Sequence, residues 1–232
     1  MSNIGILLVA TNKYKQFVSP LVDTIKEYFL VDDDVTIFLF SDRPAAGLPV
    51  FNLKIPNLTF PDATLKRYHI FLNFSHLLID QDYLYYMDVD SKIVSKVDKE
   101  ILPDAPNQLV LCRHPGFWEG GGSWETRVKS MCYVKPEDRL KYYAGGFLGA
   151  KATTFLKVAA ELKEMIHKDL LRGITPVWHD ESALNCLAVT YPNIKELPPA
   201  YIYPESKKDW FTWPGTPKIL ALDKDHENIR KE

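Results

Sequence analysis

The segment Asp88-Val89-Asp90 carries two carboxylates at a spacing suited to metal chemistry. It follows the apolar run Tyr83–Met87, which predicts a buried strand. Alternation along an extended backbone would place Asp88 and Asp90 on one face, with Val89 pointing away. Such a pair suits a hard divalent cation, Mn²⁺ or Mg²⁺, whose remaining positions are filled by phosphate oxygens and water. The plain alternative is a solvated turn, because aspartate is common after strands.

A second acidic cluster, Trp178-His179-Asp180-Glu181-Ser182, stands where a helix is expected to begin. One carboxylate there would act as a nucleophile or stabilise a cationic intermediate, while the other orients a substrate. Because Asp180 and Glu181 are neighbours, they cannot both point at one atom. Carboxylates at a helix N-terminus are equally explained by capping and by the helix dipole.

Cations elsewhere in the chain would serve a phosphate-bearing ligand. Arg67 lies in a predicted helix and is a candidate phosphate partner. The C-terminal segment adds Lys224, His226, Arg230 and Lys231. This segment is either a solvated tail or a flap that closes on bound phosphates. His114 precedes a Pro-Gly turn that would expose its imidazole, although a lone histidine is commonly structural.

Composition excludes several classes of protein. The 232 residues have a formal net charge of -2, which leaves no basic footprint for nucleic acid. The longest apolar run near the N-terminus, Ile4–Ala10, is too short for a membrane span and has no basic leader. We therefore expect a soluble, cytoplasmic protein without an integral membrane segment. The three cysteines have no zinc-ligand spacing, and no Walker, G-x-G-x-x-G, H-E-x-x-H or G-x-S-x-G motif occurs.

The first half of the chain alternates strand and helix patterns. Strands are predicted at Ile4–Ala10, Val35–Phe40 and Tyr83–Met87, and helices begin at Ser19-Pro20 and Pro61-Asp62. This alternation predicts a parallel sheet with right-handed crossovers. Ligands of such sheets gather beyond the carboxyl ends of the strands, which is where Asp88 and Asp90 stand.

The second half is more mixed. Strands are predicted at Gln108–Arg113, Ser130–Val134 and Tyr142–Ala150, and helices at Lys151–Leu171 and Glu181–Val189. Glycines within the third of these strands favour close approach of a ligand to the backbone. No linker divides the chain, so one α/β domain is expected.

Taken together, these segments resemble glycosyltransferase family 6, the retaining family of the histo-blood group A and B transferases and the α-1,3-galactosyltransferases. Three motifs carry the resemblance in family order: His114-Pro115-Gly116-Phe117, Tyr142-Tyr143-Ala144-Gly145-Gly146 and Trp178-His179-Asp180-Glu181-Ser182. Further matches are Ala10–Tyr14, Phe40–Ala46, Asp62–Arg67, Asp88–Asp90, Pro199–Tyr201 and the basic tail. The chain looks like a short bacterial or phage-type member.

The resemblance implies a GT-A fold, with a Rossmann-like mixed sheet flanked by helices in a single domain over 1–232. Residues 1–95 would form a nucleotide-binding half, 96–215 an acceptor and catalytic half, and 216–232 a flexible basic tail. The implied reaction moves N-acetylgalactosamine or galactose from a UDP donor to O3 of a β-galactoside, fucosylated or plain. The new linkage would be α-1,3, with the donor's configuration retained.

Roles are carried over residue by residue from the matching motifs. Glu181 matches the catalytic carboxylate, and Asp88 and Asp90 match the metal-binding pair. The expected donor site comprises Val9, Ala10, Thr11, Tyr14, Arg67, Asp88, Val89, Asp90, Ala144, Gly145, Gly146, Asp180, Lys224 and Arg230. The expected acceptor site comprises His114, Ser123, Trp178, His179 and Glu181.

Departures from the family pattern sharpen these expectations. Some bacterial members carry Asn-x-Asn and work without metal, whereas this chain keeps both aspartates, so dependence on Mn²⁺ or Mg²⁺ is expected. Ala144 with Gly146 is similar to the N-acetylgalactosamine-transferring pattern, since a small residue at 146 leaves room for the acetamido group. The loop Trp118–Ser123 is short and glycine-rich. Two alternatives remain: a nucleotide-sugar hydrolase and a non-catalytic carbohydrate-binding protein on the same fold.

Overall fold

The computed structural model describes residues 1–206 and 211–230, without the side chain of Arg230. Its main sheet has seven strands in the order β3-β2-β1-β4-β7-β6-β8. These strands are β1 (Asn3–Val9), β2 (Asp34–Ser41), β3 (Phe51–Lys54), β4 (Tyr83–Met87), β6 (Leu109–Arg113), β7 (Tyr143–Lys151) and β8 (Ile194–Leu197). The expected mixed α/β architecture in a single domain is confirmed, and it is consistent with the GT-A type of fold.

Strands β1, β2 and β4 pair in parallel, as their alternation with helices predicts. In this arrangement the end of β1 lies beside the end of β4, so Val9 and Met87 finish at the same edge of the sheet. Strand β7 then runs antiparallel to both β4 and β6. The backbone amide of Asp88 donates to Gly146 O over 2.9 Å, which places the start of β7 beside the end of β4.

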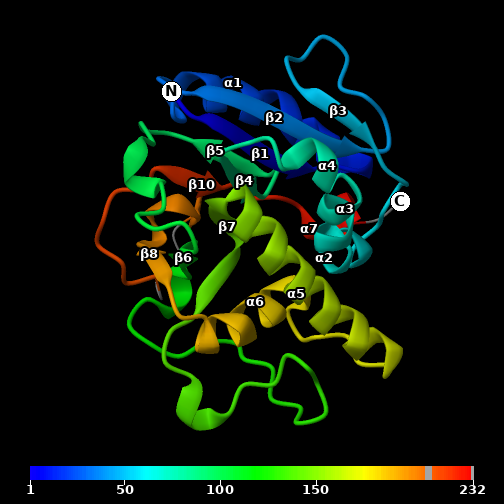
Figure 1. The fold of residues 1–232 in the computed structure, drawn as a ribbon, viewed down its shortest axis with the longest axis vertical. Coiled ribbons are helices and arrows are strands. Elements are labelled where there is room, and N and C mark those ends of the chain that lie inside the picture. Colours follow the sequence, from blue (N-terminus) through cyan, green and yellow to red (C-terminus); the bar gives the residue numbers. More distant parts are fainter. Residues whose placement is uncertain (207–210, 231–232) are drawn as a thin grey trace.

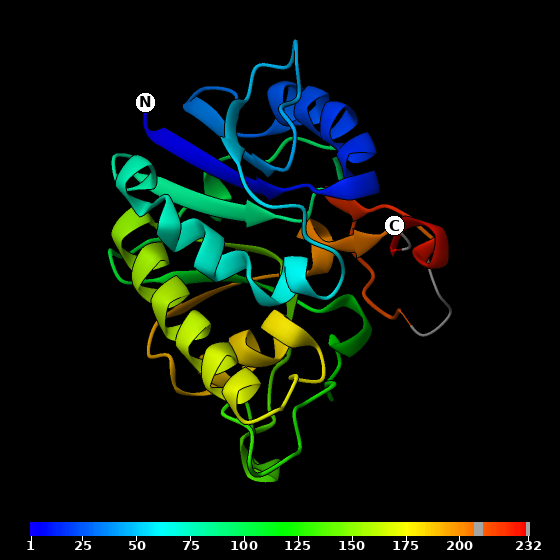
Figure 2. The ribbon, with the colours of Figure 1, turned by 90° about the vertical axis from the view of Figure 1, so that its right-hand side faces the viewer.

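Helices cover the two faces of this sheet unequally (Figures 1 and 2). One face carries α1 (Val18–Tyr28). The other carries α3 (Arg67–Asn73), α5 (Ala152–Leu171) and α6 (His179–Thr190), which pack on one another. Short helices complete the set: α2 (Asp62–Leu65), α4 (Ser75–Leu78) and α7 (His226–Arg230).

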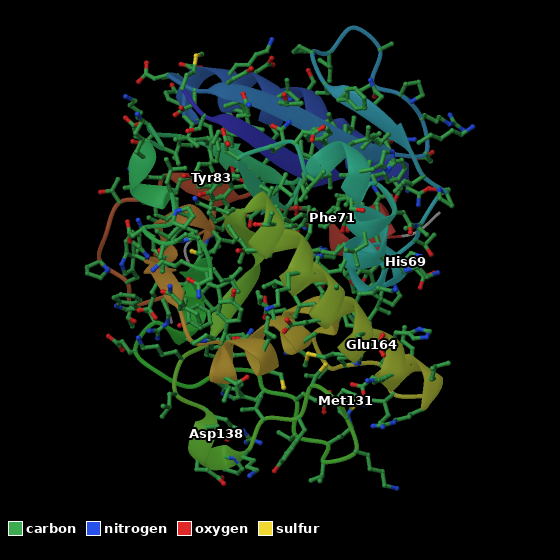
Figure 3. The ribbon with its side chains drawn as sticks, viewed as in Figure 1. His69, Phe71, Tyr83, Met131, Asp138 and Glu164 are labelled. Atoms are coloured by element: carbon green, nitrogen blue, oxygen red, sulfur yellow. The ribbon has the colours of Figure 1, made fainter. Side chains whose placement is uncertain are left out.

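Apolar side chains from each sheet face build a separate core. Ile4, Ile6 and Leu8 of β1 pack toward α1, whereas Leu7 belongs to the cluster under α3 and α5. This is the alternation that an extended strand requires. On α3, Phe71 is fully buried while His69 is exposed at the periphery (Figure 3). The continuous apolar run of β1 is therefore explained by burial on both faces.

A small sheet of β5 (Ser91–Ile93), β10 (Ile219–Ala221) and β9 (Tyr203–Pro204) lies past the end of β4. Strand β10 pairs antiparallel with β5 and parallel with β9. Leu222 N donates to Asp90 O over 2.8 Å. The chain segment after residue 216 is thereby brought against the loop that carries Asp88 and Asp90.

The predicted strand Ser130–Val134 is wrong. The segment is a turn, because its polar groups bond to Asp169 of α5 instead of to a neighbouring strand. Met131 N donates to Asp169 Oδ1 over 2.6 Å, the Ser130 hydroxyl also contacts that carboxylate, and Cys132 N donates to Ser130 Oγ over 2.9 Å. Met131 lies in this loop region at the lower end of the molecule (Figure 3).

Other differences concern boundaries and short elements. The helix expected from Pro61 is three pieces, α2, α3 and α4. Helix α1 begins at Val18, one residue before the expected Ser19 cap. Strands β3, β5, β8, β9 and β10 were not predicted; all have four residues or fewer, too few for a periodicity to register. Within the described ranges, no helix is long and apolar enough to cross a membrane.

Candidate active site

A cavity lies beyond the carboxyl ends of β1 and β4. Eight residues of the expected donor site line it: Val9, Thr11, Tyr14, Arg67, Asp88, Val89, Asp90 and Lys224. The other lining residues were not among the expected site residues, although Asn12, Ala63 and Thr64 lie within the matching segments Ala10–Tyr14 and Asp62–Arg67. They are Asn12, Leu58, Thr59, Phe60, Ala63, Thr64, Tyr86 and Ile229. Residues 58–60 belong to an irregular connection between β3 and α2, where no periodicity or motif marks them. Ala10, also expected here, is fully buried beneath the cavity.

Hydrogen bonds fix the wall opposite the acidic residues. The Thr11 hydroxyl donates to Leu58 O over 2.6 Å, and Asn12 Nδ2 donates to the same oxygen over 3.1 Å. Asn12 has a φ of 54°, a conformation that asparagine tolerates better than most residues. The loop after β1 is thus held against the 58–60 connection.

A second cavity, named the shared cavity from here on, adjoins the first. It has three residues in common with the first cavity: Asp88, Asp90 and Lys224. Its other lining residues include His114, Ala144, Gly146 and Glu181, together with Pro115, Ile202, Pro204, Phe211, Ala221, Leu222, Asp223 and His226. The structure therefore brings candidate donor and acceptor residues, 24 to 110 positions apart in the chain, to one place.

Three expected acceptor residues lie just outside this cavity. Trp178 is half exposed, and its indole Nε1 donates to the Ser123 hydroxyl. His179 packs edge-on against Phe60, with ring centroids 5.0 Å apart. His179 also lines a third cavity, together with Trp124 and Glu125.

The two aspartates after β4 face the shared cavity, although both stand past the last strand residue. Strand alternation therefore does not govern them, and Val89 lines the first cavity as well. The Tyr86 hydroxyl donates to Asp88 Oδ1, and the Lys224 ammonium contacts Asp90 Oδ2. A Cβ on Gly146 would meet Asp88 Oδ2 at 2.5 Å, so a glycine is needed beside this carboxylate.

These two carboxylates fit a hard divalent cation. Their oxygens are the ligands that Mg²⁺ and Mn²⁺ prefer, and one or two protein carboxylates suffice when phosphates supply the rest. Among the described residues, no group of three or more His, Cys, Asp or Glu side chains is gathered at one point. The Lys224 ammonium beside Asp90 shows that this position already accommodates positive charge.

Arg67 joins the two acidic clusters. Its guanidinium is nearly buried, with Nη1 2.8 Å from Asp180 Oδ2 and Nη2 3.5 Å from Asp88 Oδ1. It stacks over the Tyr86 ring, 4.1 Å from the centroid. Burial raises the pKa of Asp180 to about 6 even though the Arg67 charge opposes that shift.

Glu181 makes a different set of contacts. Its Oε2 accepts from Gly145 N over 2.8 Å, and its Oε1 accepts from the Tyr142 hydroxyl over 2.8 Å. Asp180 and Glu181 thus point at different partners, as their adjacency requires. Burial raises the pKa of Glu181 to about 7, with the two hydrogen bonds opposing the shift and Asp180 adding to it.

His114 lies at the edge of the shared cavity. Its Nδ1 accepts from Gly116 N over 3.1 Å, which caps the turn Pro115–Phe117. Burial lowers the pKa of His114 to about 4, so the ring is neutral at pH 7. A neutral ring with one nitrogen committed to the turn offers its other nitrogen to a ligand.

The C-terminal cations are only partly described. Lys224 lines both cavities, and its ammonium lies 5.4 Å from the centroid of the Tyr14 ring. Helix α7 packs against the loop after β1, where Lys13 Nζ donates to Asn228 O over 2.8 Å. The side chain of Arg230 and the whole of Lys231 lie outside the described residues, so the structure does not place those two charges.

Comparison with known proteins agrees with this architecture. A mixed sheet with an acidic pair past its central strand is typical of nucleotide-sugar transferases of the GT-A type. The profile of glycosyltransferase family 6 matches residues 1–231, and the chain belongs to that family.

Named relatives include vertebrate and bacterial enzymes. The chain is 30% identical over 243 residues to histo-blood group ABO system transferase 1 of Rattus norvegicus, covering 99% of this chain and 69% of the relative. It is 25% identical over 246 residues to human globoside alpha-1,3-N-acetylgalactosaminyltransferase 1, covering 98% and 68%. It is also 25% identical over 242 residues to the O-antigen biosynthesis glycosyltransferase WbnI of Escherichia coli, covering 98% and 99%. The chain is accordingly a glycosyltransferase that moves a hexose unit from a nucleotide sugar to a glycan.

Proposed function

We propose that this enzyme transfers N-acetylgalactosamine, or galactose, from a UDP donor to O3 of a β-galactoside, with retention of the α configuration. The observation that carries this proposal is the shared cavity, where Asp88, Asp90 and Glu181 meet next to His114. The names of relatives that transfer N-acetylgalactosamine to form alpha-1,3 linkages support the choice of sugar and linkage.

In the proposed donor site, the first cavity holds the nucleotide. Val9, Thr11 and Tyr14 line it on the side of β1, where the base and ribose would lie. Asp88 and Asp90 would hold a divalent cation, Mn²⁺ or Mg²⁺, that neutralises the diphosphate as it leaves. Lys224 and Arg230 add positive charge from the C-terminal segment, which is the role expected of them as phosphate clamps.

The donor sugar would lie along the start of β7. Ala144 and Gly146 line the shared cavity there, and their resemblance to the N-acetylgalactosamine-transferring pattern favours a donor with an acetamido group. Asp180, held by Arg67, would orient the sugar hydroxyls through the same network that positions Asp88. We favour N-acetylgalactosamine over galactose on this basis.

Glu181 is the proposed catalytic residue. Its carboxylate is fixed by Gly145 N and Tyr142, and it would act on the sugar as a nucleophile or stabilise the positive charge that develops there. His114, Ser123, Trp178 and His179 would bind the acceptor, with a half-exposed indole available to stack on a sugar face. Enclosure by α7 would exclude water that competes with the acceptor.

A donor and acceptor screen tests the proposal. UDP-N-acetylgalactosamine, UDP-galactose and UDP-glucose are each incubated with fucosylated and plain β-galactosides, in Mn²⁺ and in EDTA. We expect an α-1,3-linked product from the first donor and little product in EDTA. Free sugar without a transferred product would indicate a hydrolase instead, and full turnover in EDTA would remove the metal-binding role of Asp88 and Asp90.

A further inference from the structure

The Tyr142 hydroxyl lies between the Glu181 carboxylate and the backbone of the 118–123 loop. It lies 2.8 Å from Glu181 Oε1 and 3.2 Å from the backbone oxygen of Ser123. Gly145 N, three residues further along, lies 2.8 Å from the other oxygen of the same carboxylate. Tyr142, which immediately precedes β7, and Gly145 within β7 therefore supply one donor to each oxygen of Glu181.

The Tyr142 ring has no freedom to withdraw this hydroxyl. It is fully buried and packs edge-on against Trp124, Phe117 and His114, with centroids 5.0, 5.1 and 5.7 Å away. A Cβ on Gly122 would meet Tyr142 Cδ2 at 2.6 Å, so the 118–123 loop closes tightly over the ring. A ring packed in this way holds its hydroxyl where a carboxylate can accept from it.

The nature of the two acceptor oxygens decides where the Tyr142 hydroxyl donates its proton. Burial raises the pKa of Tyr142, so the hydroxyl keeps its proton and acts as a donor at neutral pH. A hydroxyl has one proton, which it gives either to the Glu181 carboxylate or to Ser123 O. Donation to an ionised carboxylate is the stronger bond, so it favours the charged form of Glu181.

We propose that Tyr142 is a positioning residue, whose hydroxyl donates to Glu181 Oε1, holds this carboxylate aimed at the sugar and favours its ionised form. The proposal rests on the proposed catalytic role of Glu181. It adds a residue from the acceptor side whose effect on turnover depends on pH.

Other charged groups also face Glu181. Asp180 precedes it on α6, and Asp88 acts on it from the end of β4. The cavity that Glu181 lines also holds Asp90, Lys224, Asp223 and His226, and the neutral His114 ring. The Tyr142 hydroxyl contacts Glu181 Oε1 and Ser123 O, so removing this hydroxyl tests its own contribution to Glu181.

The test compares Tyr142→Phe with Tyr143→Phe. Tyr143 is the neighbouring tyrosine and is also buried. Its hydroxyl donates to Glu196 Oε2 over 3.1 Å instead of to Glu181. We expect Tyr142→Phe to move the acid limb of the kcat profile upward by about one pH unit. Turnover then falls roughly tenfold near pH 6 and changes little above pH 8.5, since Glu181 ionises there in both proteins. KM for each substrate stays near the wild-type value.

A titration in the absence of substrates supplies a second readout. The side-chain ¹³C signal of Glu181, assigned by its loss in Glu181→Gln, is followed with pH in wild type and both tyrosine variants. We expect an upward shift of its midpoint in Tyr142→Phe alone. This measurement requires only folded protein, so it also serves if turnover is too low to profile.

The outcomes separate the two proposals. If Glu181→Gln is inactive but Tyr142→Phe loses turnover equally at every pH, or the ¹³C midpoint does not move, the role of Tyr142 is overturned and that of Glu181 stands. An identical shift in Tyr143→Phe would also overturn it, because packing alone would then explain the effect. Full turnover by Glu181→Gln would overturn both.

Discussion

The two acidic pairs of the site differ in what surrounds them. Asp88 and Asp90 follow a strand, face a cavity, and contact a hydroxyl and an ammonium. Asp180 and Glu181 open a helix. Asp180 is paired with the Arg67 guanidinium, and Glu181 is held by the Gly145 amide and the Tyr142 hydroxyl. Burial raises the pKa of both members of the second pair.

This contrast assigns different chemistry to similar side chains. Carboxylates contacted by a hydroxyl and an ammonium at a cavity can give their lone pairs to a divalent cation that also takes phosphate ligands. A carboxylate with a raised pKa, held by fixed protein donors on both oxygens, keeps one direction, which suits it to act on one atom of a substrate. Arg67 connects the two environments, since it contacts Asp88 and Asp180 together.

Removing the charge of Glu181 has the largest expected effect. Glu181→Gln should reduce kcat by roughly 10²- to 10³-fold, because the amide can neither attack nor stabilise a cationic sugar. Turnover of UDP-sugar with acceptor measures it. Glu164→Gln on α5, an exposed residue paired with Lys168, is the matched control. Equal loss in the control would point to general damage.

Breaking the connection between the pairs should act on stability. Arg67→Met leaves Asp180 buried without its cation, which we expect to lower the free energy of unfolding by about 3 kcal/mol at pH 8. The loss should shrink toward pH 5, because Asp180 without Arg67 takes up a proton more readily. Urea unfolding at both pH values measures this difference. A loss of the same size at both pH values would contradict the pairing.

The cavity-facing pair should respond to metal instead of to pH. Asp88→Asn is expected to raise the Mn²⁺ concentration for half-maximal turnover by about 10- to 100-fold. Asp23→Asn, an exposed carboxylate on α1, should leave that value unchanged. Direct Mn²⁺ binding, followed by electron paramagnetic resonance, gives the same comparison without turnover. Unchanged Mn²⁺ binding in Asp88→Asn would exclude this carboxylate as a ligand.

The smallest expected effect is the stability cost of the Glu181 charge. Its pKa of about 7 lies above the usual value, so the folded state binds the proton more tightly than the unfolded chain does. The stabilisation of the folded state by this bound proton is therefore complete at low pH, and it is lost as pH rises toward and through 7. Between pH 6 and pH 8, wild type should lose about 1 kcal/mol more unfolding free energy than Glu181→Gln. Urea unfolding measures these free energies. An equal change in unfolding free energy with pH in the two proteins would count against the raised pKa of Glu181.

Long, strongly patterned segments could be predicted from sequence because their periodicity reflects burial. Strand β4 occupies the predicted Tyr83–Met87, and helix α5 begins one residue after the predicted Lys151. The segment Ser130–Val134 has a strand-like pattern too, yet the Asp169 carboxylate accepts hydrogen bonds from its Ser130 hydroxyl and its Met131 amide. The local pattern of a segment does not reveal that a buried carboxylate from a distant part of the chain will bind its polar groups.

For the candidate site, the motifs located most of the residues but not their relations. Asp88, His114 and Glu181 were each singled out by local chemistry, whereas Tyr142 was noted only as part of a motif. Its hydroxyl gains a role from contact with a residue 39 positions away. The 58–60 wall was missed for the same reason, since an irregular connection carries no periodic signal.

The amino-acid sequence by itself determined the α/β class, the family and the identities of the acidic pairs, because hydrophobic period and residue chemistry are local properties. Only the tertiary structure decided which groups contact each carboxylate. It also decided that Arg67 bridges the pairs and that Tyr142 reaches Glu181. These properties depend on desolvation and on distances between distant segments, and the packing of β4, β7 and α6 sets both.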